Sequence, residues 1–206
     1  MMKQIKNNSQ SHGMQDFEIK LHHACSNRDT RTCLELLTRF GYKVINRNQT
    51  LLFAVKNENV KIVSELLKLN IDVNIQNSEG ETALHIASKL GNLTIVCQLL
   101  ENNANIDMKD SKYGESALHK AVWNGHIDIM ERLLSNGANC NIQDDDIGWT
   151  PLHVAVYMNN LKVVQKFLQI VNDLNIRLDV KTLDEKQILH LAWQWKKKIS
   201  RSSRRL

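Results

Sequence analysis

The sequence holds eight histidines, whose imidazole rings would first suggest metal binding or acid–base chemistry. Five of them occupy one position of a short recurring phrase: His22, His85, His119, His153 and His190. The other three, His12, His23 and His126, have no neighbours at the spacing of metal ligands. Because recurrence at one position is typical of a structural role, we expect no metal site and no catalytic histidine.

Cys25 is the cysteine with a histidine close by in the sequence, at His22 or His23, and a nucleophilic cysteine would need such a base. We expect Cys25 to be a small core residue instead, because it directly follows a recurring alanine on an apolar helix face. The sequence contains no glycine-rich phosphate loop, GxSxG elbow or HExxH segment. The run Asp144 to Asp146 lacks calcium-loop spacing and is interpreted as a solvated hairpin tip. The sequence therefore predicts no enzymatic activity, no cofactor, no metal and no small-molecule substrate.

The histidines belong to a repeat that sets the architecture. The phrases LHHAC, LLFAV, LHIAS, LHKAV, LHVAV and LHLAW place alanines at 24, 54, 87, 121, 155 and 192, which are 30, 33, 34, 34 and 37 residues apart. Two apolar pairs follow most of these alanines at a fixed offset, as in Ile95, Val96, Leu99 and Leu100, and predict a second amphipathic helix. The copies at 80–107 and 148–169 resemble ankyrin repeats, and the resemblance covers roughly residues 18–195.

The resemblance implies an all-α ankyrin-repeat solenoid of about five helix-turn-helix repeats plus a partial C-terminal repeat, joined by short β-hairpin-like loops. Thr82, Ser116 and Thr150 stand where a hydroxyl can cap the first helix, and Pro151 follows at the first helical position. The turn after each first helix favours glycine. Gly91 and Gly125 occupy that position, whereas Asn159 and especially Glu58 suit it less well.

The register divides the chain into a disordered N-terminal segment at 1–15, a repeat domain at 16–195 and a basic tail at 196–206. The predicted repeats lie near 16–45, 46–78, 79–112, 113–146 and 147–183, with a partial repeat at 184–195. We expect Trp193 and Trp195 to close the stack, although an exposed docking site is the alternative.

The formal net charge of +5 arises in the tail, which carries Lys196, Lys197, Lys198, Arg201, Arg204 and Arg205. These residues are candidates for a nuclear-import signal, with an anionic-surface contact or an unstructured solubilising tail as alternatives. Six charges without interleaved aromatic residues argue against nucleic acid as the main partner.

The cellular location follows from what the sequence lacks. It contains no run of 18 apolar residues, no secretory leader and no compact cysteine framework. We therefore expect a monomer in the cytoplasm, the nucleus or both, without membrane insertion.

In ankyrin proteins, as the resemblance implies, partners contact the hairpin tips and the exposed side of the first helices along the concave face. Projecting that pattern onto this chain predicts partner-binding residues concentrated toward the C-terminal half. They are Lys89, Leu90, Tyr113, Glu115, Trp123, Asn124, Ile147, Trp149, Tyr157 and Met158. Exposed aromatic side chains are typical binding anchors, although packing between repeats is the alternative role for them.

Three functions are compatible with such a protein-binding module. A stand-alone run of repeats resembles the inhibitor-of-kappa-B class and its viral-type relatives, which sequester Rel-type transcription factors. No DSGxxS degradation signal is present, so such an inhibitor would act constitutively. A substrate-recruiting adaptor in a complex such as a ubiquitin ligase is the second possibility, although no recruitment box is recognisable. A nucleic-acid-associated protein is the third and the least supported.

Overall fold

The computed structural model describes residues 19–21, 23–27, 29–39, 47–69 and 71–178. Residues 19–21 and 23–26 are helical. The helices that follow are α2 (Thr30–Arg39), α3 (Arg47–Lys56), α4 (Val60–Leu67), α5 (Ala83–Leu90), α6 (Leu93–Glu101), α7 (Ala117–Trp123), α8 (Ile127–Ser135), α9 (Pro151–Tyr157) and α10 (Leu161–Asp173). The predicted all-α solenoid is confirmed for the described residues.

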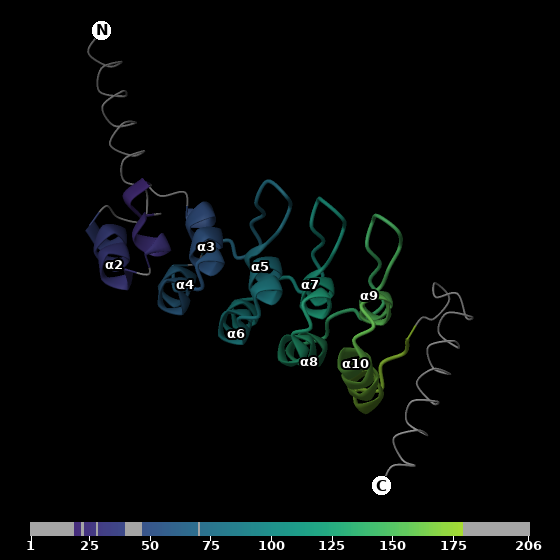
Figure 1. Ribbon diagram of the computed structural model, residues 1–206. Helices are drawn as coiled ribbons and strands as arrows, with labels where there is room; N and C mark the ends of the chain where they lie inside the picture. Colours follow the sequence, from purple (N-terminus) through teal and green to yellow (C-terminus); the bar gives the residue numbers. More distant parts are fainter. Residues whose placement is uncertain (1–18, 22, 28, 40–46, 70, 179–206) are drawn as a thin grey trace.

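The helices form two parallel rows (Figure 1). The first helices α3, α5, α7 and α9 pack in sequence order along one row, and the second helices α2, α4, α6, α8 and α10 along the other. The pairs from α3/α4 to α9/α10 lie within the repeats predicted at 46–78, 79–112, 113–146 and 147–183. Three hairpin loops rise from the row of first helices (Figure 1). This row and its hairpins form the face that carries the candidate site.

The first helices begin as their sequence predicts. The hydroxyls of Thr82, Ser116 and Thr150 accept the backbone N–H three residues later, and the histidine there accepts the N–H of the capping residue through Nδ1. Each cap therefore satisfies two backbone donors at a helix start. Pro151 occupies the first turn of α9, where a missing N–H costs nothing.

The turns between paired helices use left-handed backbone at the predicted position. Gly91 and Gly125 have φ of 84° and 71°, and Glu58 and Asn159 adopt φ of 55° and 49° at the equivalent places. A side chain strains this conformation, more for glutamate than for asparagine, which tolerates left-handed backbone. The α3–α4 turn is thus conformationally the poorest of these four.

The core lies between the two rows. The apolar stripes of the second helices are buried at Ile62, Val63, Ile95, Val96, Leu99, Ile129, Met130, Leu133, Leu134, Val163 and Phe167. Leu168 follows Phe167 on α10 and is 39% exposed, although the equivalent residue of the preceding repeat, Leu134, is buried. It lies on α10, which contacts α8 and α9 within the described part of the chain and so presents one side to no other described helix. No helix among the described residues is long and apolar enough to cross a membrane.

Candidate protein-binding site

Two of the motif histidines, His85 and His119, connect neighbouring repeats. The Nε2 atom of His85 lies 3.0 Å from the carbonyl oxygen of Glu115, and that of His119 lies 2.9 Å from the carbonyl oxygen of Trp149. Because Nδ1 accepts the cap N–H, Nε2 carries the proton and donates it to the next hairpin. Burial lowers the pKa of both imidazoles, so they are neutral at physiological pH. No group of residues that could hold a metal ion occurs in the described chain.

The hairpins also bond directly to one another at their tips. The N–H of Ser111 donates to the carbonyl of Glu79 at 2.9 Å, and the N–H of Asp145 donates to the carbonyl of Tyr113 at 2.8 Å. Gly80 permits the first contact, since a Cβ there would lie 2.1 Å from Ser111 Oγ. The three hairpins consequently form one continuous ridge beside the first helices.

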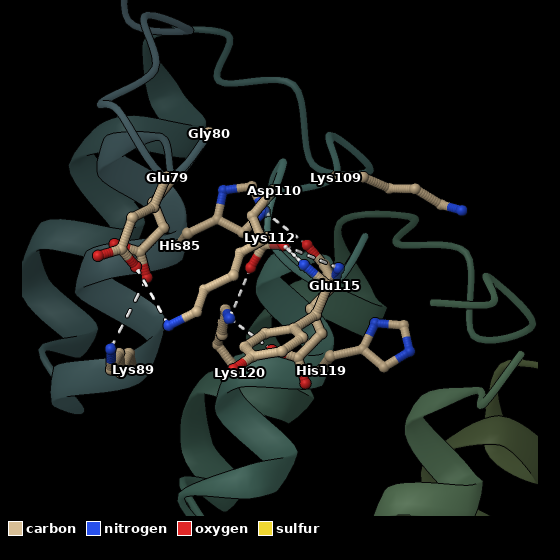
Figure 2. A network of polar contacts seen from close by, with 12 residues as sticks. Glu79, Gly80, His85, Lys89, Lys109, Asp110, Lys112, Glu115, His119 and Lys120 are labelled. Atoms are coloured by element: carbon tan, nitrogen blue, oxygen red, sulfur yellow. Dashed lines mark hydrogen bonds and ion pairs between the residues drawn. The ribbon is translucent and has the colours of Figure 1, made fainter. Parts of the chain in front are cut away.

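A buried ion-pair network lies beneath this ridge (Figure 2). Lys120 of α7 reaches toward the hairpin that precedes α7. There its Nζ lies 2.6 Å from Asp110 Oδ2 and also contacts the carboxylate of Glu115. Burial opposes the charge of Lys120, but hydrogen bonds to the two carboxylates outweigh it and raise the pKa of the ammonium group. Burial likewise opposes ionisation of Asp110, yet the bond from Lys120 and backbone N–H donors hold its pKa below the usual range.

Glu115 uses its second carboxylate oxygen to fix an aromatic ring. The indole Nε1–H of Trp123 donates to Glu115 Oε1, while Lys120 binds the other oxygen. The Asp110 carboxylate in turn accepts the backbone N–H of Tyr113 at 2.9 Å. The network thereby holds the hairpin, the first helix and the Trp123 indole in one arrangement.

A cleft of about 320 Å³ opens between two hairpins above α7. Its lining comes from the ends of α5 and α7 and from both hairpins: Lys89, Tyr113, Glu115, Lys120, Trp123, Asn124, Asp144, Asp146, Ile147 and Trp149. This volume is at the small end of ligand pockets, which span roughly 300–1,000 Å³. The cleft therefore suits one side chain of a partner rather than a large ligand.

Aromatic rings from three places in the sequence meet beside this cleft. The ring centroids of Trp149 and Tyr157 are 4.8 Å apart, and those of Trp123 and Tyr157 are 6.0 Å apart in an edge-to-face arrangement. Tyr157 is 66% exposed, and the two tryptophans are half-buried. We call Trp123, Trp149 and Tyr157 the aromatic cluster. It packs internally and still presents a face to solvent, so the packing role is observed and the role as a binding anchor stays a prediction.

The structure brings most of the sequence-predicted contact residues together. Seven of the ten line the cleft, and Leu90, Tyr157 and Met158 are exposed outside its lining. Glu115 differs from its expected role as an exposed contact, because its carboxylate is committed to Lys120 and Trp123 and the residue is 8% exposed. It serves as a wall of the cleft.

Sequence reasoning missed Lys120 and assigned Asp144 only to a solvated hairpin tip. The sequence does contain a signal for Lys120. The residue before the motif alanine is apolar in the neighbouring copies, as at Ile86 and Val154, so a lysine there stands out as a charge at an otherwise apolar position. Asp144 Oδ1 accepts the N–H groups of Ile147 and Trp149, each at 3.0 Å, so it builds the hairpin that carries them. Asp145 pairs with Lys109 at 2.7 Å.

Cys25 occupies the core, as the sequence predicts. It is fully buried, whereas His23 is exposed, and its sulfur lies 3.2 Å from that of Cys33. This contact lowers the pKa of Cys25 and raises that of Cys33. The predicted roles of Trp193, Trp195 and the basic residues Lys196, Lys197, Lys198, Arg201, Arg204 and Arg205 lie outside the described residues.

A row of stacked helix pairs with a ridge of hairpins defines a repeat solenoid. Comparison with known families identifies which one. The family described as ankyrin repeats (3 copies) matches residues 21–110, 51–144, 99–182 and 118–199. The chain belongs to the ankyrin repeat family. Its repeats are therefore a protein–protein interaction module, and the family is generally non-enzymatic.

Individual relatives match shorter stretches. Neurogenic locus notch homolog protein 2 of Homo sapiens is 41% identical over 51 residues, which is 25% of this chain and 2% of that protein. Regulatory protein NPR1 of Arabidopsis thaliana is 30% identical over 110 residues, 51% of this chain and 18% of that protein. Palmitoyltransferase AKR1 of Lachancea kluyveri is 31% identical over 100 residues, 45% of this chain and 14% of that protein. The chain thus spans less than a fifth of each relative.

Proposed function

We propose that this chain is an inhibitor of the inhibitor-of-kappa-B kind, which sequesters a signalling protein or a Rel-type transcription factor. The partner lies against the face formed by the hairpins and the first helices, and the contacts centre on the cleft. The observation that carries the proposal is the aromatic cluster. Its rings, held beside a rigid ion-pair network, match the aromatic anchors that dominate protein interfaces.

Two further observations support sequestration. The contact residues belong to hairpins and helices that already bond to one another, so little ordering entropy opposes binding. The similarity to regulatory protein NPR1 of Arabidopsis thaliana is compatible with a regulatory role. The Rel-type class of partner rests on the resemblance of the repeats to that class of inhibitor.

The test uses the full chain, a purified Rel-type factor and a labelled DNA duplex that the factor binds. We expect the chain to release the factor from DNA. Tyr157→Ala should weaken the complex about tenfold, because the side chain is 66% exposed and acts as an anchor. Leu168→Ala is the matched control, since Leu168 is also exposed but belongs to α10, which lies in the row of second helices away from the hairpins (Figure 1).

Two results would contradict the proposal. If the chain binds no Rel-type factor while circular dichroism shows it folded, the partner class is wrong. Affinity purification from cells then distinguishes the remaining possibility, because recovery of ubiquitin-ligase subunits would favour the adaptor. If Tyr157→Ala and Leu168→Ala weaken the complex equally, the contact face is elsewhere.

A further inference from the structure

The charges that line the cleft do not balance. Three carboxylates, those of Glu115, Asp144 and Asp146, face two ammonium groups, those of Lys89 and Lys120. Both ammonium groups already lie near carboxylates that do not line the cleft. Lys120 contacts Asp110, and Lys89 Nζ lies 3.7 Å from Glu81. The surroundings of the cleft are therefore negative, and a cation is the charge that they would stabilise.

Asp146 is the carboxylate best placed to meet a ligand. Glu115 is occupied by Lys120 and Trp123, and Asp144 accepts two N–H groups of its own turn. Asp145, next to it, is paired with Lys109 at 2.7 Å and does not line the cleft. Asp146 is exposed and lines the cleft.

The walls of the cleft add a second preference for a cation. Trp123, Trp149 and Tyr113 contribute aromatic surface, and Tyr157 packs against the two tryptophans. Tyr113 already attracts cations, since Lys112 Nζ lies 5.1 Å and Lys120 Nζ 6.0 Å from its ring centroid. The faces of aromatic rings attract cations, and tryptophan does so most strongly.

We propose that the cleft binds an arginine side chain presented by the partner protein. The inference deepens the proposed function and rests on it, because it names the chemistry by which the partner is recognised. A planar guanidinium can stack on an indole face and donate to Asp146 at the same time. Lysine is a compact, strongly hydrated point charge that cannot stack in this way, and an acidic or apolar side chain would leave Asp146 without a partner.

The test uses the full chain with four synthetic peptides of twelve residues, glycine and serine throughout except for one central residue. That residue is arginine, lysine, citrulline or leucine. Binding is followed by the tryptophan indole N–H signals in nitrogen–proton NMR spectra, where Trp123 is identified by its loss in Trp123→Phe. Citrulline has the shape of arginine without its charge. We expect the arginine peptide to shift the Trp123 signal saturably and the citrulline and leucine peptides to leave it unchanged.

Two adjacent aspartates provide a matched pair of variants. Asp146→Asn removes a carboxylate from the cleft lining, whereas Asp145→Asn removes the same charge from the same hairpin outside the lining. We expect Asp146→Asn to weaken the arginine peptide about three- to fivefold and Asp145→Asn to change it by less than about 1.5-fold. Rising salt should weaken binding, because the contact is an exposed charge interaction.

The outcomes separate this inference from the proposed function. If all four peptides shift Trp123 equally, or none does, while the chain still binds the Rel-type factor, arginine recognition is wrong and sequestration stands. If the arginine peptide binds selectively but no Rel-type factor does, the cleft chemistry stands and the partner class is wrong. Equal effects of the two aspartate variants would overturn the assignment of Asp146.

Discussion

The repeats built on α5 and α7 differ from the repeat built on α3 in how they connect to their neighbours. His85 and His119 each donate a hydrogen bond to the backbone of the following hairpin. Leu52 occupies the equivalent position in α3 and has no polar side-chain atom, so it cannot make such a bond. Apolar packing holds the Leu52 side chain instead. We infer that directed polar contacts fix the hairpin ridge and the cleft, while α3 mainly covers apolar surface.

The turns show the same contrast. Gly91 and Gly125 take left-handed backbone without strain, whereas Glu58 adopts φ of 55° at the α3–α4 turn. The α3–α4 repeat thus lacks both the bridging histidine and the turn glycine. We therefore expect substitutions that remove polar contacts of α5–α8 to lower the stability of the chain, and substitutions in the α3–α4 repeat to be able to raise it.

The largest effect is expected from Lys120→Ala. The change leaves Asp110 and Glu115 as buried carboxylates without their cation, and breaking such a pair costs about 3–5 kcal/mol. Urea unfolding should show this loss, with increased hydrogen exchange in α7 and α8. Lys89→Ala is the control and should cost less than about 1 kcal/mol, because Lys89 is exposed, its Nζ lies 3.7 Å from Glu81 and Glu81 keeps a hydrogen bond from Asn77. If Lys120→Ala loses no more unfolding free energy than Lys89→Ala, the buried network adds no more stability than the contact of Lys89.

The second-largest effect is expected at low pH, which should destabilise the repeats that His85 and His119 connect. Burial lowers the pKa of His85 and His119 in the folded state, so the unfolded chain binds protons more readily below its own histidine pKa of about 6.5. Stability is therefore complete above about pH 6.5 and falls as pH decreases, by at most about 1.4 kcal/mol per histidine at pH 5.5. Protection factors, which correct for the intrinsic exchange rate at each pH, should fall more in α5–α8 than in α3–α4 when the pH is lowered from above 6.5 to 5.5. An equal fall in both regions would contradict the contrast between them.

Two glycine-to-alanine variants test how much the contact between hairpin tips contributes to stability. Gly80→Ala places a Cβ 2.1 Å from Ser111 Oγ, whereas a Cβ at Gly137 meets no atom within 4 Å. Both residues have positive φ, so both variants carry similar backbone strain of about 1 kcal/mol. The clash should add about 1–3 kcal/mol in Gly80→Ala alone, as measured by thermal unfolding. If the two variants lose equal stability, the contact between hairpin tips is easily rearranged.

The smallest expected effect is an increase in stability. Glu58→Gly removes the strained turn residue and should stabilise the chain by about 1 kcal/mol, seen as a higher urea midpoint. Asn159→Gly relieves less strain, because asparagine tolerates left-handed backbone, and should yield only a few tenths of a kcal/mol. A loss of stability in Glu58→Gly would show that the glutamate side chain compensates the strain, for example through its 3.4 Å contact with Asn92.

Much of the fold was predictable because its signals are local. The hydroxyl caps at Thr82, Ser116 and Thr150 and the turn at Gly91 depend on residues within one or two helical turns, and all take the predicted roles. Candidate contact residues were predictable in part, since a fixed repeat frame places them on one face. Burial of Glu115 was not, because it depends on Lys120 and Trp123 reaching the same carboxylate.

The sequence by itself determined the period, the helix pairs and the histidine at the start of α5, α7 and α9, because each repeat folds by the same short-range rules. Only the tertiary structure decided that Trp123, Trp149 and Tyr157 meet and that Asp146 lines their cleft while Asp145 does not. The rings stand on α7, the next hairpin and α9, so their distances depend on how successive repeats stack. That stacking is set by the hydrogen bonds of His85 and His119 and by the contacts between hairpin tips, which join residues about 30 positions apart.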